Sequence, residues 1–88
     1  MSFSQTGSPL TINGNGSVVA SQACPAGATV ISGGLQINSG NTHNFVLAQS
    51  FPSNGANPPG AGNTAWTVNI VNTGSGSGTF TVYSICVQ

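Results

Sequence analysis

The feature that most restricts the fold of this chain is the absence of charged side chains. Its 88 residues include no Asp, Glu, Lys or Arg. Three of the better helix-forming residues, Glu, Lys and Arg, are therefore missing. The chain is rich instead in Gly, Ser, Thr, Asn and Val, which favour turns and strands over helices. The composition predicts an all-β protein.

The same absence disfavours several classes of function. Phosphate backbones and anionic membrane surfaces are bound through Lys and Arg, so we expect neither nucleic acid nor a charged membrane as a partner. No stretch approaches the roughly 18 apolar residues that span a bilayer, so we expect no membrane insertion. Carboxylates and Lys are also missing for acid-base and covalent catalysis.

The remaining reactive side chains are one His and two Cys. His43 lies in "SGNTHN", where we expect an exposed loop. Hydrolysis by a Cys, His and Asn set would require Cys24 or Cys86 to be free beside His43. Two sulfurs and one imidazole without CxxC or HxxxH spacing do not make a zinc site. The sequence therefore predicts no enzyme, no catalytic residue, no metal and no cofactor.

Strand patterns recur along the chain, separated by clusters of Gly, Asn, Pro and Ser. They predict one domain, residues 1–88, folded as a small antiparallel β-sandwich or jelly-roll-like domain of about six strands. Residues 1–16 are expected as an extended N-terminal segment that either adds to a neighbour's sheet or is frayed. The expected strands cover residues 10–12, 17–23, 29–37, 44–51, 65–72 and 79–87.

The last two expected strands have different patterns. In "AWTVNIVN", Trp66, Val68 and Ile70 share one face, as in a half-buried strand. In "TFTVYSICVQ" both faces are apolar over the second half, which predicts a central strand or one covered by a neighbouring subunit. The Gly-rich stretch 72–79 predicts a hairpin between these two strands. Gly33 and Gly34, inside an apolar strand, predict a bulge or bend.

Cys24 and Cys86 lie near the two ends of the strand-rich region. In a small Gly-rich β protein this spacing favours a structural disulfide between distant strands. A closed loop of this length would stabilise the domain by about 4 kcal/mol. The alternative is a buried pair of free thiols in a reducing compartment, and the sequence leaves it open.

Four short motifs carry a resemblance to a known domain. "CPAGATVISGG", "SFP", "AWTVNIVN" and "TVYSIC" together resemble a small β-sandwich domain of exported bacterial proteins and of phage tail or collagen-like surface proteins. The pattern, CPAG, GG, WxV and YxxC, spans residues 23–86. It implies a disulfide-linked extracellular or virion-surface domain without an established catalytic role. Such domains commonly place Lys or Arg where this chain has Ala28 and Thr29, so both a natural subunit and an engineered charge-free relative fit.

These observations lead to three functional hypotheses. A chain without net charge lacks self-repulsion, which favours a non-enzymatic structural subunit that associates with copies of itself on an extracellular or virion surface. The second hypothesis is a carbohydrate-binding or receptor-binding module, using Asn54 and Asn57 of the loop 52–64 with Trp66 or Tyr83 as an aromatic platform. For Trp66 the alternative is core packing. The third is an engineered uncharged protein without activity of its own.

Overall fold

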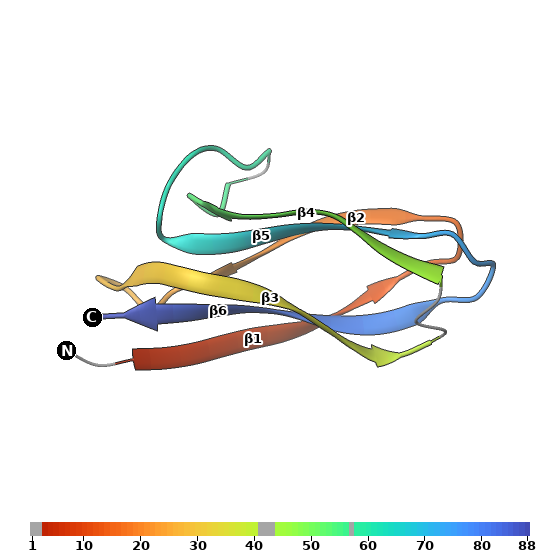
Figure 1. The fold of residues 1–88 in the computed structure, drawn as a ribbon, viewed down its shortest axis with the longest axis horizontal. Helices are drawn as coiled ribbons and strands as arrows, with labels where there is room; N and C mark the ends of the chain where they lie inside the picture. The colour runs from red at the N-terminus through yellow and green to blue at the C-terminus, as the bar shows by residue number, and fades with distance from the viewer. Residues whose placement is uncertain (1–2, 41–43, 57) are drawn as a thin grey trace.

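Six strands alternate with Gly-rich and Asn-rich turns, and the predicted all-β sandwich is confirmed (Figure 1). The computed structural model describes residues 3–40, 44–56 and 58–88. Within these residues there is no helix that could cross a membrane. The strands are β1 Phe3–Ile12, β2 Ser17–Ala23, β3 Thr29–Ser39, β4 Phe45–Ser53, β5 Ala65–Asn72 and β6 Gly78–Val87.

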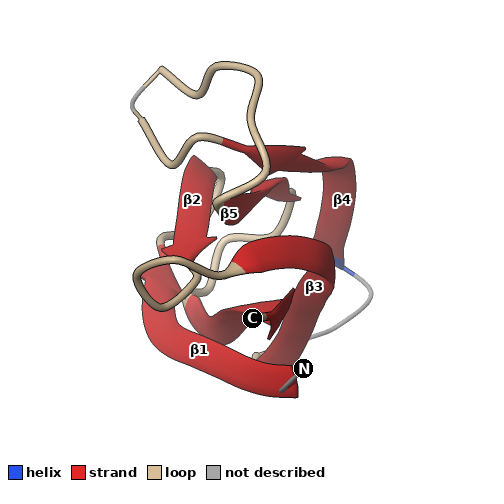
Figure 2. Ribbon diagram, turned by 90° about the vertical axis from the view of Figure 1, so that its left-hand side faces the viewer, coloured by secondary structure: helices blue, strands red, loops and turns tan. Residues whose placement is uncertain are grey.

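The strands form two antiparallel three-stranded sheets that pack face to face (Figure 2). The first sheet has the order β1-β6-β3 and the second has the order β2-β5-β4. The prediction of a central position for the last strand is confirmed. Phe80 and Val82 of β6 are fully buried between the sheets, whereas Tyr83 and Ile85 alternate with buried residues and lie on the outer face.

The predicted hairpin at residues 72–79 is wrong, because β5 and β6 belong to different sheets. Asn72 explains how the chain crosses between them. Its buried Nδ2 donates to the carbonyl oxygens of Asn13 (3.2 Å) and Gly76 (2.8 Å), and its Oδ1 accepts the amide of Gly74 (3.0 Å). These bonds satisfy backbone hydrogen-bonding groups of the turns at this end of the sandwich. Of the five connections, only that between β4 and β5 joins strands of one sheet.

The N-terminal segment forms a longer strand than predicted. All ten residues of β1 pair with β6, from Phe3 opposite Val87 to Ile12 opposite Gly78. This segment therefore adds to a sheet of its own chain, and residues 3–12 are not frayed. Pairing with β6 orders residues 3–12, although the polar sequence of β1 does not predict a strand of this length.

The core consists of two adjoining clusters of buried side chains. Trp66 packs against both of them and joins them. The second cluster includes the disulfide at one end of the sandwich. The first contains Ile12, Ala20, Val68, Ile70, Phe80 and Val82, and the second contains Ala28, Val30 and Cys86.

Trp66 of β5 meets the backbone of Gly33 of β3 where the two sheets face each other. A Cβ atom on Gly33 would lie 2.1 Å from Cγ of Trp66, so only glycine fits beneath the indole. The glycine pair itself forms no bulge, because Gly33 and Gly34 pair in continuous register with Ser84 and Tyr83, and the nearest register shift lies before them, between Val30 and Ser32. Gly33 is therefore required by packing.

Candidate functional site

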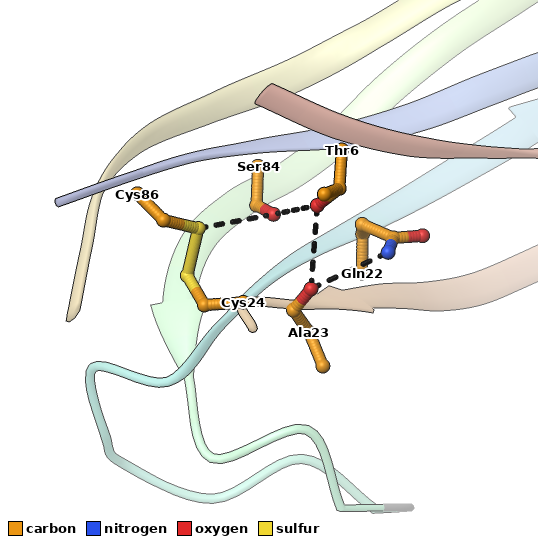
Figure 3. Close-up of a disulfide and its surroundings, with 6 residues drawn as sticks. All are labelled: Thr6, Gln22, Ala23, Cys24, Ser84 and Cys86. Atoms are coloured by element: carbon orange, nitrogen blue, oxygen red, sulfur yellow. Dashed lines mark hydrogen bonds between the residues drawn. A yellow bond between two sulfur atoms is a disulfide. The ribbon is translucent and has the colours of Figure 1, made fainter. Parts of the chain in front are cut away.

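The predicted disulfide is confirmed: Cys24 is bonded to Cys86, 62 residues further along the chain. Cys24 follows the last residue of β2, in the second sheet, and Cys86 lies in β6, in the first. The bond therefore joins the two sheets covalently at one end of the sandwich (Figure 3). A structural disulfide is consistent with an oxidising, extracellular setting.

A short series of polar side chains lies beside the disulfide (Figure 3). Sγ of Cys86 lies 3.5 Å from Oγ of Ser84, which is 3.0 Å from Oγ1 of Thr6. Thr6 also donates to the carbonyl oxygen of Ala23, at 3.4 Å. These contacts connect β1, β6 and the end of β2, so their arrangement is that of a structural joint.

Trp66 is partly buried, with its side chain packed against the core. Its Nε1 donates to Oγ of Ser50 at 2.8 Å, and its ring lies against Gly33. The side chain is half-buried and contacts both core clusters. The expectation of core packing therefore describes Trp66 better than an aromatic platform for a ligand.

Tyr83 lies on the outer face of the first sheet. Its register partners on both sides are glycines, Gly7 in β1 and Gly34 in β3. A Cβ atom on Gly34 would lie 2.8 Å from the Tyr83 hydroxyl and 3.1 Å from Cζ. The ring therefore extends across the backbone of Gly34, covering a strand position that has no side chain of its own.

Asn54 organises the loop that follows β4. Its Oδ1 accepts the backbone N–H groups of Ala56 (2.9 Å) and Gly60 (3.1 Å). The backbone N–H of Asn54 donates to the Gly60 carbonyl oxygen (3.2 Å). The side-chain oxygen is thus used inside the loop. Asn57, the other predicted loop residue, lies outside the described residues. The loop is shorter than predicted, because β4 continues to Ser53.

A buried row of hydroxyl groups crosses the outer face of the second sheet, and the local sequence pattern does not predict it. Thr67 Oγ1 donates to Ser53 Oγ at 2.6 Å and lies 2.7 Å from Ser21 Oγ. Ser53 Oγ also accepts the amide of Gly55, at 3.1 Å. Thr67 and Ser53 are fully buried where the loop after β4 rises over this face (Figure 1). Strand alternation alone predicts an exposed Thr67.

Replacing Thr67 with valine should lower the free energy of unfolding by about 1–3 kcal/mol, because it leaves a buried hydroxyl without its partner. Thr79→Val is the matched control, since Thr79 makes a similar 2.7 Å bond to Ser39 at an exposed site. The control should change stability by less than about 0.5 kcal/mol. Urea denaturation of both variants measures the difference, and equal losses would contradict a role for the buried row.

An apolar patch lies on the outer face of the first sheet, at its disulfide end. Phe3 is 65% exposed and pairs with Val87, while Ile31, at the bulge in β3, is 53% exposed. Ile85 lies on β6, between β1 and β3, and is diagonal to Phe3. We call Phe3, Ile31, Ile85 and Val87 the disulfide-end patch. No other part of the described chain covers it.

A second apolar patch lies on the outer face of the second sheet. Val46 pairs with Val71 across β4 and β5, and Val19 lies diagonal to Val71 on β2. Val19 and Val46 are about half exposed, at 51% and 50%. We call Val19, Val46 and Val71 the valine patch. It lies toward the end of the sandwich opposite the disulfide, where β5 ends and β4 begins (Figure 1).

The sheet edges have protection that does not depend on charge. β1 contains Pro9, β3 has two register shifts, and β4 has a register shift and Pro52. Proline and bulges both interrupt the regular ladder that an added strand needs. Only β2 lacks such a device, and its Gln22 accepts a bond from Ser8 of β1 at 2.7 Å. Contacts with other molecules are therefore favoured at the faces.

The described part of the chain contains neither a pocket nor a cluster of metal-ligating side chains. His43, with its predicted loop setting, lies outside that part. The only described titratable side chain is Tyr83, since both cysteines are bonded to each other. What the described surface offers is therefore two uncharged sheet faces, each with an apolar patch.

No protein-family model matches the chain, and comparisons with curated proteins and with solved structures find no significant match.

Proposed function

We propose that this protein is a non-enzymatic structural subunit that associates with copies of itself in an extracellular or virion-surface assembly. The observation that carries the proposal is the pair of uncovered apolar patches on the outer faces of the sandwich. Exposed apolar surface that is contiguous commonly marks an interaction site. The disulfide supports an oxidising location for the assembly.

The missing charges favour a second copy as the partner. Two charge-free surfaces meet without desolvating an ion and without like-charge repulsion. A charged partner would find no side chain here to pair with its ions. Burial of apolar surface at about 25 cal/mol per Å² is then the main favourable contribution to binding.

A carbohydrate-binding function has less support from the geometry. Trp66 packs in the core and Asn54 holds its own loop together. Tyr83 offers an aromatic ring on a flat sheet face, without a surrounding pocket in the described residues. Ligand sites are usually concave, so the flat faces are better suited to another protein surface.

Light scattering coupled to size exclusion tests the proposal, with the oxidised protein measured over a dilution series at low and high salt. We expect a defined species heavier than the 8.7 kDa single chain. Its mass should fall on dilution and should not fall as salt is raised, because no ion pair is available to screen. A single-chain mass at every concentration would refute the proposal, and so would disordered precipitate.

A further inference from the structure

We infer that the copies associate head to tail, with the disulfide-end patch of one copy packed on the valine patch of the next. This inference rests on the proposed function and specifies its interface. The partner is a second copy of the same chain, and the contact is heterologous, joining two different surfaces. A heterologous contact that does not close into a ring produces an open filament.

The positions of the two patches support this arrangement. They lie on opposite outer faces, because one belongs to the first sheet and the other to the second. They also lie toward opposite ends of the sandwich, which is 43 Å long (Figure 1). A second copy can therefore be shifted perpendicular to the sheets and along the strands, without rotation. Its disulfide-end patch then lies over the valine patch of the first copy.

The contact would repeat the packing already present inside the molecule. Within one chain the first sheet packs on the second, and aligned sheets pack about 10 Å apart. In the proposed contact, the first sheet of one copy packs on the outer face of the second sheet of another. Protruding Phe3 and Ile31 would lie against the shorter side chains Val19 and Val46.

The loop after β4 makes the contact staggered. It stands over the outer face of the second sheet at the disulfide end (Figure 1, Figure 2), where Gly55 of the loop donates its amide to Oγ of Ser53. A neighbouring sheet therefore has access mainly to the other half of that face, which carries Val46 and Val71. This blocked half favours the displaced arrangement over complete overlap of the faces.

The narrow faces limit the strength of each contact. Three strands about 4.8 Å apart make a face roughly 15 Å wide, so an overlap of about five residues, half of the face, covers on the order of 250 Å² per copy. Stable interfaces commonly bury about 800 Å² per partner. Each contact should accordingly be weak and dependent on concentration, while a copy within the filament makes two of them.

A mixing experiment with two full-length variants tests the inference. Ile31→Lys places a charge in the disulfide-end patch, and Val19→Lys places one in the valine patch. Both sites are about half exposed in the single chain, so circular dichroism should show that both variants fold. A buried unpaired charge should weaken the affected contact by at least about 100-fold. Ser77→Lys, in the exposed turn before β6, is the control for added charge.

The expected result is that each patch variant alone is monomeric at concentrations where the unmodified chain and Ser77→Lys associate. An equimolar mixture should then form a species of two chains and nothing larger, because one intact patch remains on each variant. The mixture separates this arrangement from symmetric pairing. Measuring mass by light scattering on the same samples gives the answer.

Other outcomes would overturn the inference. If either variant alone forms a dimer, the remaining patch pairs with itself and the contact is symmetric. If both variants assemble like the unmodified chain, association uses other surfaces and the proposed function still stands. If the unmodified chain is monomeric throughout, the proposed function fails together with the inference.

Discussion

Replacing Gly33 with alanine is expected to lower the free energy of unfolding by about 3 kcal/mol or more, at the upper end of overpacking effects in cores. The added methyl group would meet Cγ of Trp66 at 2.1 Å. The indole is confined by both core clusters and by its bond to Ser50, so it has little freedom to move aside. The total free energy of unfolding of a domain of this size is about 4–13 kcal/mol. Urea denaturation followed by circular dichroism measures the loss.

Gly76→Ala is the matched control, because a Cβ atom there has no other heavy atom within 4 Å. Its stability should change by less than about 1 kcal/mol. Combining Gly33→Ala with Trp66→Val removes the ring that the methyl group meets. The two losses should therefore be clearly less than additive. Full additivity would show that the close approach of the two sheets is not the reason for glycine at this position.

Loss of the disulfide is expected to cost about 4 kcal/mol, because the bond closes a loop of this length in the unfolded chain. The two cysteines are 62 residues apart. The double variant Cys24→Ala and Cys86→Ala should consequently unfold at a much lower urea concentration than the oxidised protein. Reduction of the unmodified chain should produce a shift of similar size, measured by circular dichroism.

The double alanine variant is the control for other effects of the reductant. Reductant should leave the unfolding curve of this variant unchanged, since it has no disulfide to reduce. Identical unfolding curves for the oxidised and reduced unmodified chain would contradict the stabilising role of the bond. A loss confined to Cys86→Ala would instead indicate that packing of this fully buried residue is responsible.

Local patterns in the sequence were sufficient to locate most of the strands. β2 and β5 coincide with their predicted ranges, and β6 begins only one residue earlier than predicted. Alternating apolar residues and Gly-rich or Asn-rich breaks are local signals, so they are visible without a structure. The cysteine pairing was also predictable, because a chain with two cysteines allows only one intramolecular bond.

The features that the sequence did not predict depend on contacts between distant residues. The first seven residues of β1 contain Gly7 and Pro9 and have few strand-forming side chains, yet they pair fully with β6. Thr67 looks exposed from alternation, but it is fully buried and its hydroxyl is bonded to Ser53 and Ser21. Nothing in the local composition of residues 72–79 distinguishes a hairpin from a crossing between sheets. Asn72 holds the crossing in place through bonds to Gly76 within it and to Asn13 in the connection between β1 and β2.

The candidate site was predictable in its chemistry but not in its location. The missing charges directed attention to uncharged contact surfaces. The prolines and register shifts of β1, β3 and β4 interrupt three of the four sheet edges, which favours contacts through the faces. Which valines and isoleucines remain uncovered follows from the register of the strands, and that depends on the whole fold.

The position of β6 in the middle of the first sheet has a consequence for synthesis of the chain. β1 is made first among the strands, but the only strand it pairs with ends at residue 87. On the ribosome, β1 and β3 must therefore wait as unpaired segments until β6 has emerged. Pairing over such a long sequence separation also slows folding. We expect the domain to fold only after β6 has been synthesised.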